Sequence, residues 1–172
     1  MVLFAFIVII GLFIVDGGLY IIFKYQLGTD GEIYQDALSI RRAVFIDEQD
    51  VSESLEIDGN DEQCWHVVGY LDGLPIVTAR FYIFNQSDKL CLKLQRIATS
   101  ASYRRQGYGR ALMEQVIEWA HQQKISQIHL SSQIQAIGFY QTVGFNTCND
   151  AIYLDAGIEH QDMIYQVNKK DL

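Results

Sequence analysis

A strand that runs through a glycine-containing turn into a helix constrains this chain more than any other stretch. Residues 90–98 alternate apolar and polar side chains, which predicts a strand. Residues 104–123 carry apolar side chains at helical spacing, which predicts a helix. The turn that opens this helix reads Arg104-Arg105-Gln106-Gly107-Tyr108-Gly109. A unit of this kind belongs in a mixed α/β domain.

The turn has the character of an anion site. Gly107 and Gly109 lack a Cβ atom, so a ligand can approach the backbone closely. The free amides of a helix N-terminus favour anions, and Arg104, Arg105 and Arg110 add positive charge. A pyrophosphate is a suitable guest. A Walker loop would need a Gly-Lys-Ser/Thr ending, and a dinucleotide fingerprint would need a small residue three places after Gly109, so neither pattern fits.

The rest of the chain predicts one sheet with few helices, in the order β-α-β-β-β-α-β-α-β-β. The Asp72-Gly73 pair predicts a hairpin turn between two of the strands. The other predicted strands are 19–26, 65–70, 75–84, 128–131, 145–154 and 163–167, and the other predicted helices are 31–46 and 134–142.

Two stretches resemble the motifs of the GNAT acetyltransferase superfamily. The turn at 104–109 matches the pattern [R/Q]-x-x-G-x-[G/A] in full, and 94–99 is similar to the strand that precedes it in that family. Residues 136–145 resemble the A-x-x-F-Y-x-x-x-G-F motif, one helix and one strand further on. The resemblance implies the GNAT, or acyl-CoA N-acyltransferase, fold: an α/β domain with a central, splayed, mostly antiparallel sheet flanked by helices.

Three further segments resemble the small ElaA-like bacterial branch of this superfamily. Residues 41–49 are similar to its RxxVFxxEQ segment, 56–66 to its ExDxxD…H run and 157–163 to its GIxHxxM tail. Together the similar segments cover about residues 19–168. We therefore expect a GNAT domain over residues 19–172.

The resemblance implies acetyl-CoA as cosubstrate. Its pantetheine arm would bind main-chain groups of Ile97, Ala98 and Thr99, and the acyl thioester would lie where the sheet splays. Gln133 occupies the place of an asparagine that contacts the cofactor in many relatives. The pyrophosphate would bind the turn residues Arg104, Arg105, Gln106, Gly107, Tyr108, Gly109 and Arg110.

The implied reaction is direct attack of a primary amine on the thioester, with Tyr140 as the acid that protonates the departing thiolate. A buried tyrosine that packs the last helix is the alternative for Tyr140. Glu48 and His160 are the favoured proton acceptors. The other candidates for that role are Asp58, Asp61 and His66. A catalytically silent acyl-CoA-binding sensor is the alternative function.

The composition of the chain limits the classes of partner that it is expected to bind. A formal net charge of −8 over 172 residues argues against nucleic-acid binding. The three cysteines are scattered, so neither a disulfide framework nor a metal site is expected. The acidic segment 47–62 is compatible with a cationic amine acceptor or with a solvated loop. The acceptor stays open, and so does a homodimer.

The first fifteen residues are apolar and uncharged, and Asp16-Gly17-Gly18 follows them. Residues 1–18 lie outside the resemblance. Three interpretations compete for them: a membrane anchor in a membrane-associated interaction protein, a partner-binding helix, or upstream sequence read from a start codon placed too early. An anchor would need ~20 apolar residues to span a bilayer. We expect the catalytic domain to be cytoplasmic in each case, tethered to the membrane only under the first.

Overall fold

The computed structural model describes residues 11–15 and 19–167. The chain divides into two compact units. The first unit comprises the chain up to Arg80 together with Arg96–Leu112, and the second comprises Phe81–Gln95 together with the chain from Met113 onward. Strands β4 (Leu74–Gln86) and β5 (Lys89–Thr99) and helix α3 (Tyr108–Gln122) each pass from one unit into the other.

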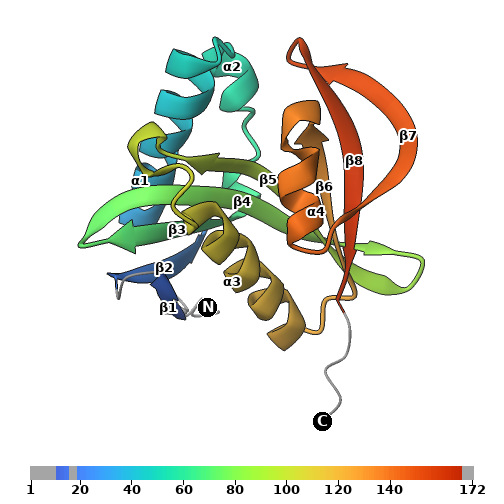
Figure 1. Cartoon of the computed structure of the whole chain (residues 1–172), viewed down its shortest axis with the longest axis horizontal. Helices are drawn as coiled ribbons and strands as arrows, with labels where there is room; N and C mark the ends of the chain where they lie inside the picture. Colours follow the sequence, from blue (N-terminus) through green and yellow to red (C-terminus); the bar gives the residue numbers. More distant parts are fainter. Residues whose placement is uncertain (1–10, 16–18, 168–172) are drawn as a thin grey trace. The chain divides into compact units, whose positions relative to one another are not determined.

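From residue 19 onward the strands and the longer helices occur in the order that the sequence predicts, while residues 11–15 form an additional strand (Figure 1). The strands are β1 (Gly11–Val15), β2 (Leu19–Leu27), β3 (Trp65–Leu71), β4 (Leu74–Gln86), β5 (Lys89–Thr99), β6 (Gln127–Gln133), β7 (Asn146–Asp155) and β8 (Ile158–Gln166). The helices are α1 (Glu32–Arg41), the π-helix η1 (Arg42–Glu48), α2 (Glu53–Glu56), η2 (Asp61–Gln63), η3 (Ala101–Tyr103), α3 (Tyr108–Gln122), η4 (Ile134–Ala136) and α4 (Ile137–Thr142). The hydrogen-bonded strand order is β1-β2-β3-β4-β5-β6-β8-β7.

In the first unit, α1 and η1 pack against β3. The buried core there consists of Ala37, Ile40, Val44, Val68, Tyr70 and Ala98. Three of these residues come from the apolar stripe of α1 and η1, and Ala98 comes from the end of β5. The end of β5 is thus held by the same core that holds the helix.

In the second unit, β6 is the strand on which the pairing changes direction. It pairs with β5 in parallel and with β8 antiparallel. The parallel register covers Cys91–Leu94 of β5 and Gln127–Leu130 of β6, whereas β5 itself continues to Thr99. The mixed, mostly antiparallel sheet predicted from the sequence is confirmed.

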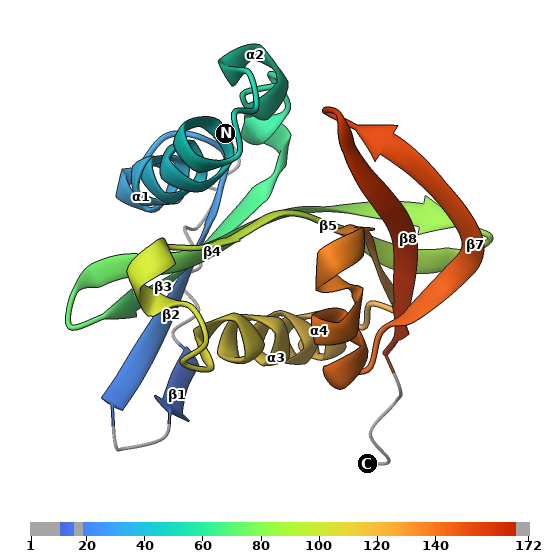
Figure 2. The same ribbon diagram turned by 45° about the horizontal axis from the view of Figure 1, so that its top comes forward.

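Two predicted boundaries differ from the structure because of residues with positive φ. The helix expected from 104 begins only at Tyr108, since Arg105 and Gly107 have φ values of 61° and 87° and cannot continue a right-handed helix. The last strand starts at Ile158, well before the predicted 163. Ala156 and Gly157 both have positive φ and close a tight hairpin (Figure 2), although Ala-Gly is not a recognised hairpin pair.

The apolar N-terminal segment is a strand over its described part. Residues 11–15 form β1 and pair antiparallel with β2, with Gly11 opposite Phe23 and Val15 opposite Leu19. Residues 1–10 and 16–18 lie outside the described residues. Among the residues that the structure describes, no helix is both long and apolar enough to cross a bilayer. Membrane tethering through residues 1–15 stays a prediction.

Candidate cofactor site and catalytic residues

The turn before α3 combines two backbone features that suit an anion. Arg105 and Gly107 adopt left-handed φ values, two residues apart, just ahead of the N-terminus of α3. Left-handed residues that interrupt right-handed or extended backbone turn successive amides toward one side and form an anion-binding concavity. Arg105, Gln106 and Gly107 are exposed, so these amides can meet a ligand. Tyr108 is 2% exposed and anchors the start of the helix against Tyr103, with the ring centroids 6.2 Å apart.

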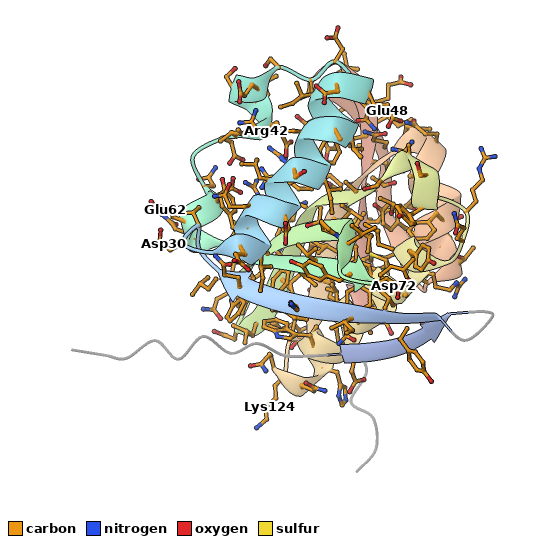
Figure 3. All side chains as sticks on the ribbon, turned by 90° about the vertical axis from the view of Figure 1, so that its left-hand side faces the viewer. Asp30, Arg42, Glu48, Glu62, Asp72 and Lys124 are labelled. Carbon is orange, nitrogen blue, oxygen red and sulfur yellow. The ribbon has the colours of Figure 1, made fainter. Side chains whose placement is uncertain are left out.

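Arg104 and Glu48, predicted to serve different purposes, form one ion pair. Arg104 Nη1 donates to Glu48 Oε1 at 2.6 Å, and Nη2 donates to Oε2 at 2.7 Å. Arg104 Nε also donates to the carbonyl oxygen of Thr99 at 3.0 Å. Glu48 lies at the end of η1, after α1 (Figure 3). The pair therefore ties η1, the end of β5 and the turn together.

This ion pair changes the acid–base character of Glu48. Hydrogen bonds from Arg104 hold the pKa of the Glu48 carboxyl below its usual value. A carboxylate with a lowered pKa accepts a proton less readily. The geometry thus supports a positioning role for Glu48 more directly than the predicted role as base.

The predicted pantetheine-binding residues form the end of β5. Ala98 is 3% exposed and lies in the core of the first unit. Ile97 and Thr99 are partly buried, and the amide of Ser100 donates to the carbonyl oxygen of Ile76 at 2.9 Å. Arg96, immediately before these residues, has a φ of 53°. A left-handed residue inside a strand marks a local kink, which redirects the residues that follow it.

The acidic segment, which the sequence leaves open between a site for a cationic acceptor and a solvated loop, has its central carboxylates bound by arginines. Asp61 accepts hydrogen bonds from Arg41 Nη1 and Arg80 Nη1, each at 2.9 Å. Asp58 accepts two from Arg80, both at 2.8 Å, which holds the pKa of Asp58 far below its usual value. The side chains of Arg41 and Arg80 are at most 1% exposed. These carboxylates are therefore structural counter-ions.

The arginines that bind the acidic segment were not identified from the sequence. Arg80 stands in a run of buried residues in β4, and Arg41 ends α1. An arginine within an otherwise apolar strand is a signal of a buried carboxylate partner, because an unpaired charge is too costly to bury. That signal, combined with the acidic spacing at 56–61, indicates that buried ion pairs are present, but it does not say which carboxylate each arginine meets.

Tyr140 lies in α4 and is 8% exposed. Its ring contacts Phe139 and Phe145 edge to face, with centroids 5.1 Å and 6.0 Å away. Burial raises the pKa of Tyr140 above its ordinary value, so the phenol stays protonated at neutral pH. This state is the one that an acid needs, and it is equally the state of a tyrosine that only packs the helix.

His160 and Gln133 face each other across β6 and β8 in the second unit. The Nδ1 atom of His160 lies 2.8 Å from the carbonyl oxygen of Ile158, which accepts a hydrogen bond, so Nδ1 carries a proton. The Nε2 atom of the neutral ring is then a bare acceptor. The imidazole stacks on Tyr153, with ring centroids 6.3 Å apart. Gln133 Oε1 accepts a hydrogen bond from Gln135 Nε2 at 2.7 Å.

His66 is poorly suited to proton transfer with a substrate. It is fully buried, and burial lowers its pKa. Its Nε2 contacts the carbonyl oxygen of Asp61 at 3.0 Å, and its Nδ1 has no hydrogen-bond partner among residues 11–15 and 19–167. Within the described ranges, no group of three or more His, Cys, Asp or Glu side chains is arranged to hold a metal ion.

The site residues predicted from the sequence divide between the two units. The first unit contains Glu48 and the two predicted cofactor-binding segments, 97–99 and 104–110. The second unit contains Gln133, Tyr140 and His160. Within each unit the structure brings predicted residues together: Glu48 meets Arg104 in the first, and Gln133 lies opposite His160 in the second.

Comparison with known proteins gives the same assignment along most of the chain. Residues 31–145 match the model of the acetyltransferase (GNAT) family. The uncharacterized protein YyaT of Bacillus subtilis is 33% identical over 147 residues, which cover 84% of this chain and 95% of YyaT. The crystal structure of Escherichia coli ElaA is 26% identical with a TM-score of 0.71, covering 85% of this chain and 99% of ElaA.

A more distant structure contains the expected cofactor. A GNAT family acetyltransferase from Elizabethkingia anophelis, solved with acetyl-CoA bound, is 15% identical with a TM-score of 0.62 and covers 85% of this chain and 97% of its own. At this identity the likeness concerns the fold alone. The family model, the curated relative and the turn at 104–109 agree, and this chain belongs to the GNAT family of acetyltransferases.

Proposed function

We propose that this protein transfers the acetyl group of acetyl-CoA to a primary amine. The turn that opens α3 is the observation that carries the proposal. It combines left-handed backbone at Arg105 and Gly107, a helix N-terminus and a local group of arginines in an acidic chain. These features suit the pyrophosphate of coenzyme A. The motif around Tyr140 and the acetyl-CoA held by the Elizabethkingia anophelis relative favour coenzyme A over a nucleotide.

Each segment has a proposed task in binding. The amides of residues 104–110 hold the pyrophosphate, and the exposed Arg105 and Arg110 supply charge. Main-chain groups of Ile97, Ala98 and Thr99 bind the pantetheine arm. Gln133 contributes an amide contact to the cofactor. Glu48 keeps Arg104 in place through their two-pronged ion pair.

The proposed chemistry is a single displacement. The acceptor ammonium loses a proton to Nε2 of His160, and the free amine attacks the thioester carbonyl. The C–N bond forms, the C–S bond breaks, and the thiolate leaves with a proton from Tyr140. The second proton that the attacking nitrogen must lose to become an amide then returns Tyr140 to its phenol form. His160 is preferred to Glu48 as the proton acceptor, because its Nδ1 hydrogen bond leaves Nε2 free for a proton, whereas Glu48 is neutralised by Arg104.

The central experiment compares two glycines that share a left-handed φ. Gly107 has a φ of 87°, and Gly73, in the β3–β4 turn, has a φ of 82° with open space where a Cβ would stand. Gly107→Val and Gly73→Val thus pay a similar backbone cost. We expect calorimetry to show that acetyl-CoA affinity falls by at least about a hundredfold in Gly107→Val.

Gly73→Val should bind acetyl-CoA as the wild type does, with a similar loss of thermal stability. Equal affinity in the two variants would contradict the assignment of the turn to the cofactor. An acceptor screen with acetyl-CoA and detection of the free thiol then tests turnover. Binding without turnover across primary amines would favour the acyl-CoA-binding sensor.

A further inference from the structure

Six charged side chains in the first unit form an interlocked set, called here the charged lattice. Its members come from the end of α1, from β4 and β5, and from the segment that runs from α2 to η2. They are Arg41, Arg80, Arg96, Glu56, Asp58 and Asp61. With three positive and three negative charges, the lattice is neutral as a whole. Paired charges of this kind can be buried, whereas a single one could not.

Arg41 and Arg80 bind the acidic segment through their buried side chains. Arg41 Nε lies 2.5 Å from Glu56 Oε1, and its Nη2 donates to the Glu56 carbonyl oxygen at 3.0 Å. Arg80 binds Asp58 with both terminal nitrogens. Because both arginine side chains are buried in the fold, they hold the acidic segment in place. The segment thus forms a platform, as it is called below.

Arg96 connects this platform to β5. Its Nε lies 2.7 Å from Glu56 Oε2, and its Nη2 donates to the carbonyl oxygen of Leu55 at 2.9 Å. Nη2 also lies 3.3 Å from Asp58 Oδ2. The guanidinium fork is thus engaged with the platform at several points, although the side chain is 20% exposed.

The backbone of Arg96 is strained where the fork holds it. Among the residues of β5, all of which the structure describes, Arg96 alone has a positive φ. The left-handed region disfavours an L-residue other than glycine by roughly tenfold in population. A conformation of this kind persists only when its surroundings determine it. The fork and its platform supply that restraint.

The kink at Arg96 lies just before the residues that are proposed to bind the cofactor. Parallel pairing with β6 covers Cys91–Leu94, and Arg96 comes two residues after its end. The next residues are Ile97, Ala98 and Thr99. A kink at Arg96 therefore sets the direction of the main-chain groups of these three residues, which the proposed function assigns to binding the pantetheine arm.

We propose that Arg96 is a positioning residue for the cofactor. Its guanidinium binds Glu56 and Asp58 of the platform and so keeps β5 in its left-handed kink. The kink in turn presents the main chain of residues 97–99 to the pantetheine arm of acetyl-CoA. The inference rests on the proposed function of the β5 end. Arg96 acts through the backbone that follows it and has no contact of its own with the cofactor.

The test uses the difference between alanine and glycine at this position. Arg96→Ala removes the guanidinium fork, and a positive φ remains unfavourable for alanine, so the kink relaxes. Arg96→Gly removes the fork as well, but glycine adopts the left-handed conformation without that cost. We expect calorimetry on the full chain to show acetyl-CoA affinity lowered by about tenfold in Arg96→Ala and by clearly less in Arg96→Gly.

Arg42→Ala is the matched control. Arg42 forms an exposed ion pair with Glu53 of the same α2 segment, outside the lattice. Its loss should leave acetyl-CoA affinity unchanged. A charge effect alone would lower the affinity in Arg42→Ala as well, and a direct cofactor contact by Arg96 would give equal losses in Arg96→Ala and Arg96→Gly. Either of these results, or wild-type affinity in Arg96→Ala, overturns the positioning role.

Two further measurements keep the inference separable from folding and from the proposed function. Arg96→Lys retains the charge but loses the fork, and wild-type affinity in this variant would contradict the role of the fork. Amide hydrogen exchange at residues 97–99 needs no ligand. If the wild type fails to bind acetyl-CoA, the proposed function is wrong. Faster amide exchange in Arg96→Ala than in Arg96→Gly would still support the restraint that Arg96 places on β5. Equal exchange in the two variants would contradict that restraint.

Discussion

At the scale of single residues, Arg104 shows how a motif residue can have a task that its motif does not state. The pattern at 104–109 associates this arginine with the cofactor, yet its Nε and both Nη atoms donate to Thr99 and Glu48. Both side chains are partly exposed, so the pair is worth only ~0.2–1 kcal/mol in stability. Its importance therefore lies in geometry, because it joins η1 to the turn.

Glu48→Gln tests this positioning role. Glutamine keeps the size of the side chain but loses the charge that holds the Arg104 fork. We expect the KM for acetyl-CoA to rise a few-fold, in line with an exposed ion pair, with kcat and its pH profile largely retained. Steady-state kinetics with the acceptor found in the screen would measure both. A fall of kcat together with loss of the acidic limb of the pH profile would instead identify Glu48 as the base.

Tyr140→Phe tests the acid. The phenyl ring keeps the packing against Phe139 and Phe145, and only the hydroxyl is lost. We expect kcat to fall by about a hundredfold, the usual size of a general-acid contribution, while the affinity for acetyl-CoA stays the same. Tyr82→Phe is the control, since Tyr82 is 38% exposed and outside the site. An unchanged kcat in Tyr140→Phe would leave this tyrosine with a packing role alone.

At the scale of elements, the segment from α2 to η2 depends on its carboxylates for its place in the fold. Its helical pieces are only 4 and 3 residues long, too short to be stable by themselves. Asp58 and Asp61 attach it to Arg80, and Glu56 attaches it to Arg41. The element is thus ordered by buried ion pairs and not by helix propensity or by an apolar face.

Asp58→Asn should destabilise the protein and reduce its sensitivity to acid. The pKa of Asp58 is lowered in the folded state, so the carboxylate stabilises the fold fully above its unfolded pKa of about 3.9. This contribution declines as the pH falls from that value toward the lower pKa of the folded state. The substitution leaves the buried Arg80 short of a partner, which costs about 3 kcal/mol at pH 7. Denaturant unfolding between pH 3 and pH 7 would show both effects.

Glu53→Gln is the control for this prediction. Glu53 is 58% exposed in its pair with Arg42, so its replacement should cost less than about 1 kcal/mol. Asp58→Asn and wild type should approach each other in stability toward pH 3. A constant difference between them at every pH would mean that the ionised carboxylate is not the source of the stabilisation.

At the scale of the whole molecule, the sheet extends beyond the part of the chain that resembles the family. Residues 11–15 pair with β2 as the first strand of the hydrogen-bonded order. The family model begins at residue 31, and the motif resemblance begins at about residue 19. Strand β2 has the exposed apolar side chains Tyr20, Ile22 and Leu27. Without β1, this strand would present a free, partly apolar edge.

A chain that begins at Leu19 should therefore self-associate more than a chain that begins at Gly11. Both lack residues 1–10, and they differ in residues 11–18, which contain β1. An unpaired strand edge is a template for pairing with another chain. Light scattering at increasing concentration would detect the difference. Identical monomer content in the two chains would show that β1 does not protect the edge of β2.

The sequence by itself determined the element order from residue 19 onward, the family and the glycine-containing turn that opens α3, because these depend on local periodicity and on short motifs whose spacing survives in one dimension. The tertiary structure alone decided which charges meet. Arg41, Arg80 and Arg96 are far along the chain from the carboxylates that they bind, and Glu48 lies 56 residues before Arg104. Such pairings arise from sheet register and helix packing, so no local pattern encodes them. The acidic segment, which the sequence leaves open between an acceptor site and a solvated loop, instead binds Arg41, Arg80 and Arg96.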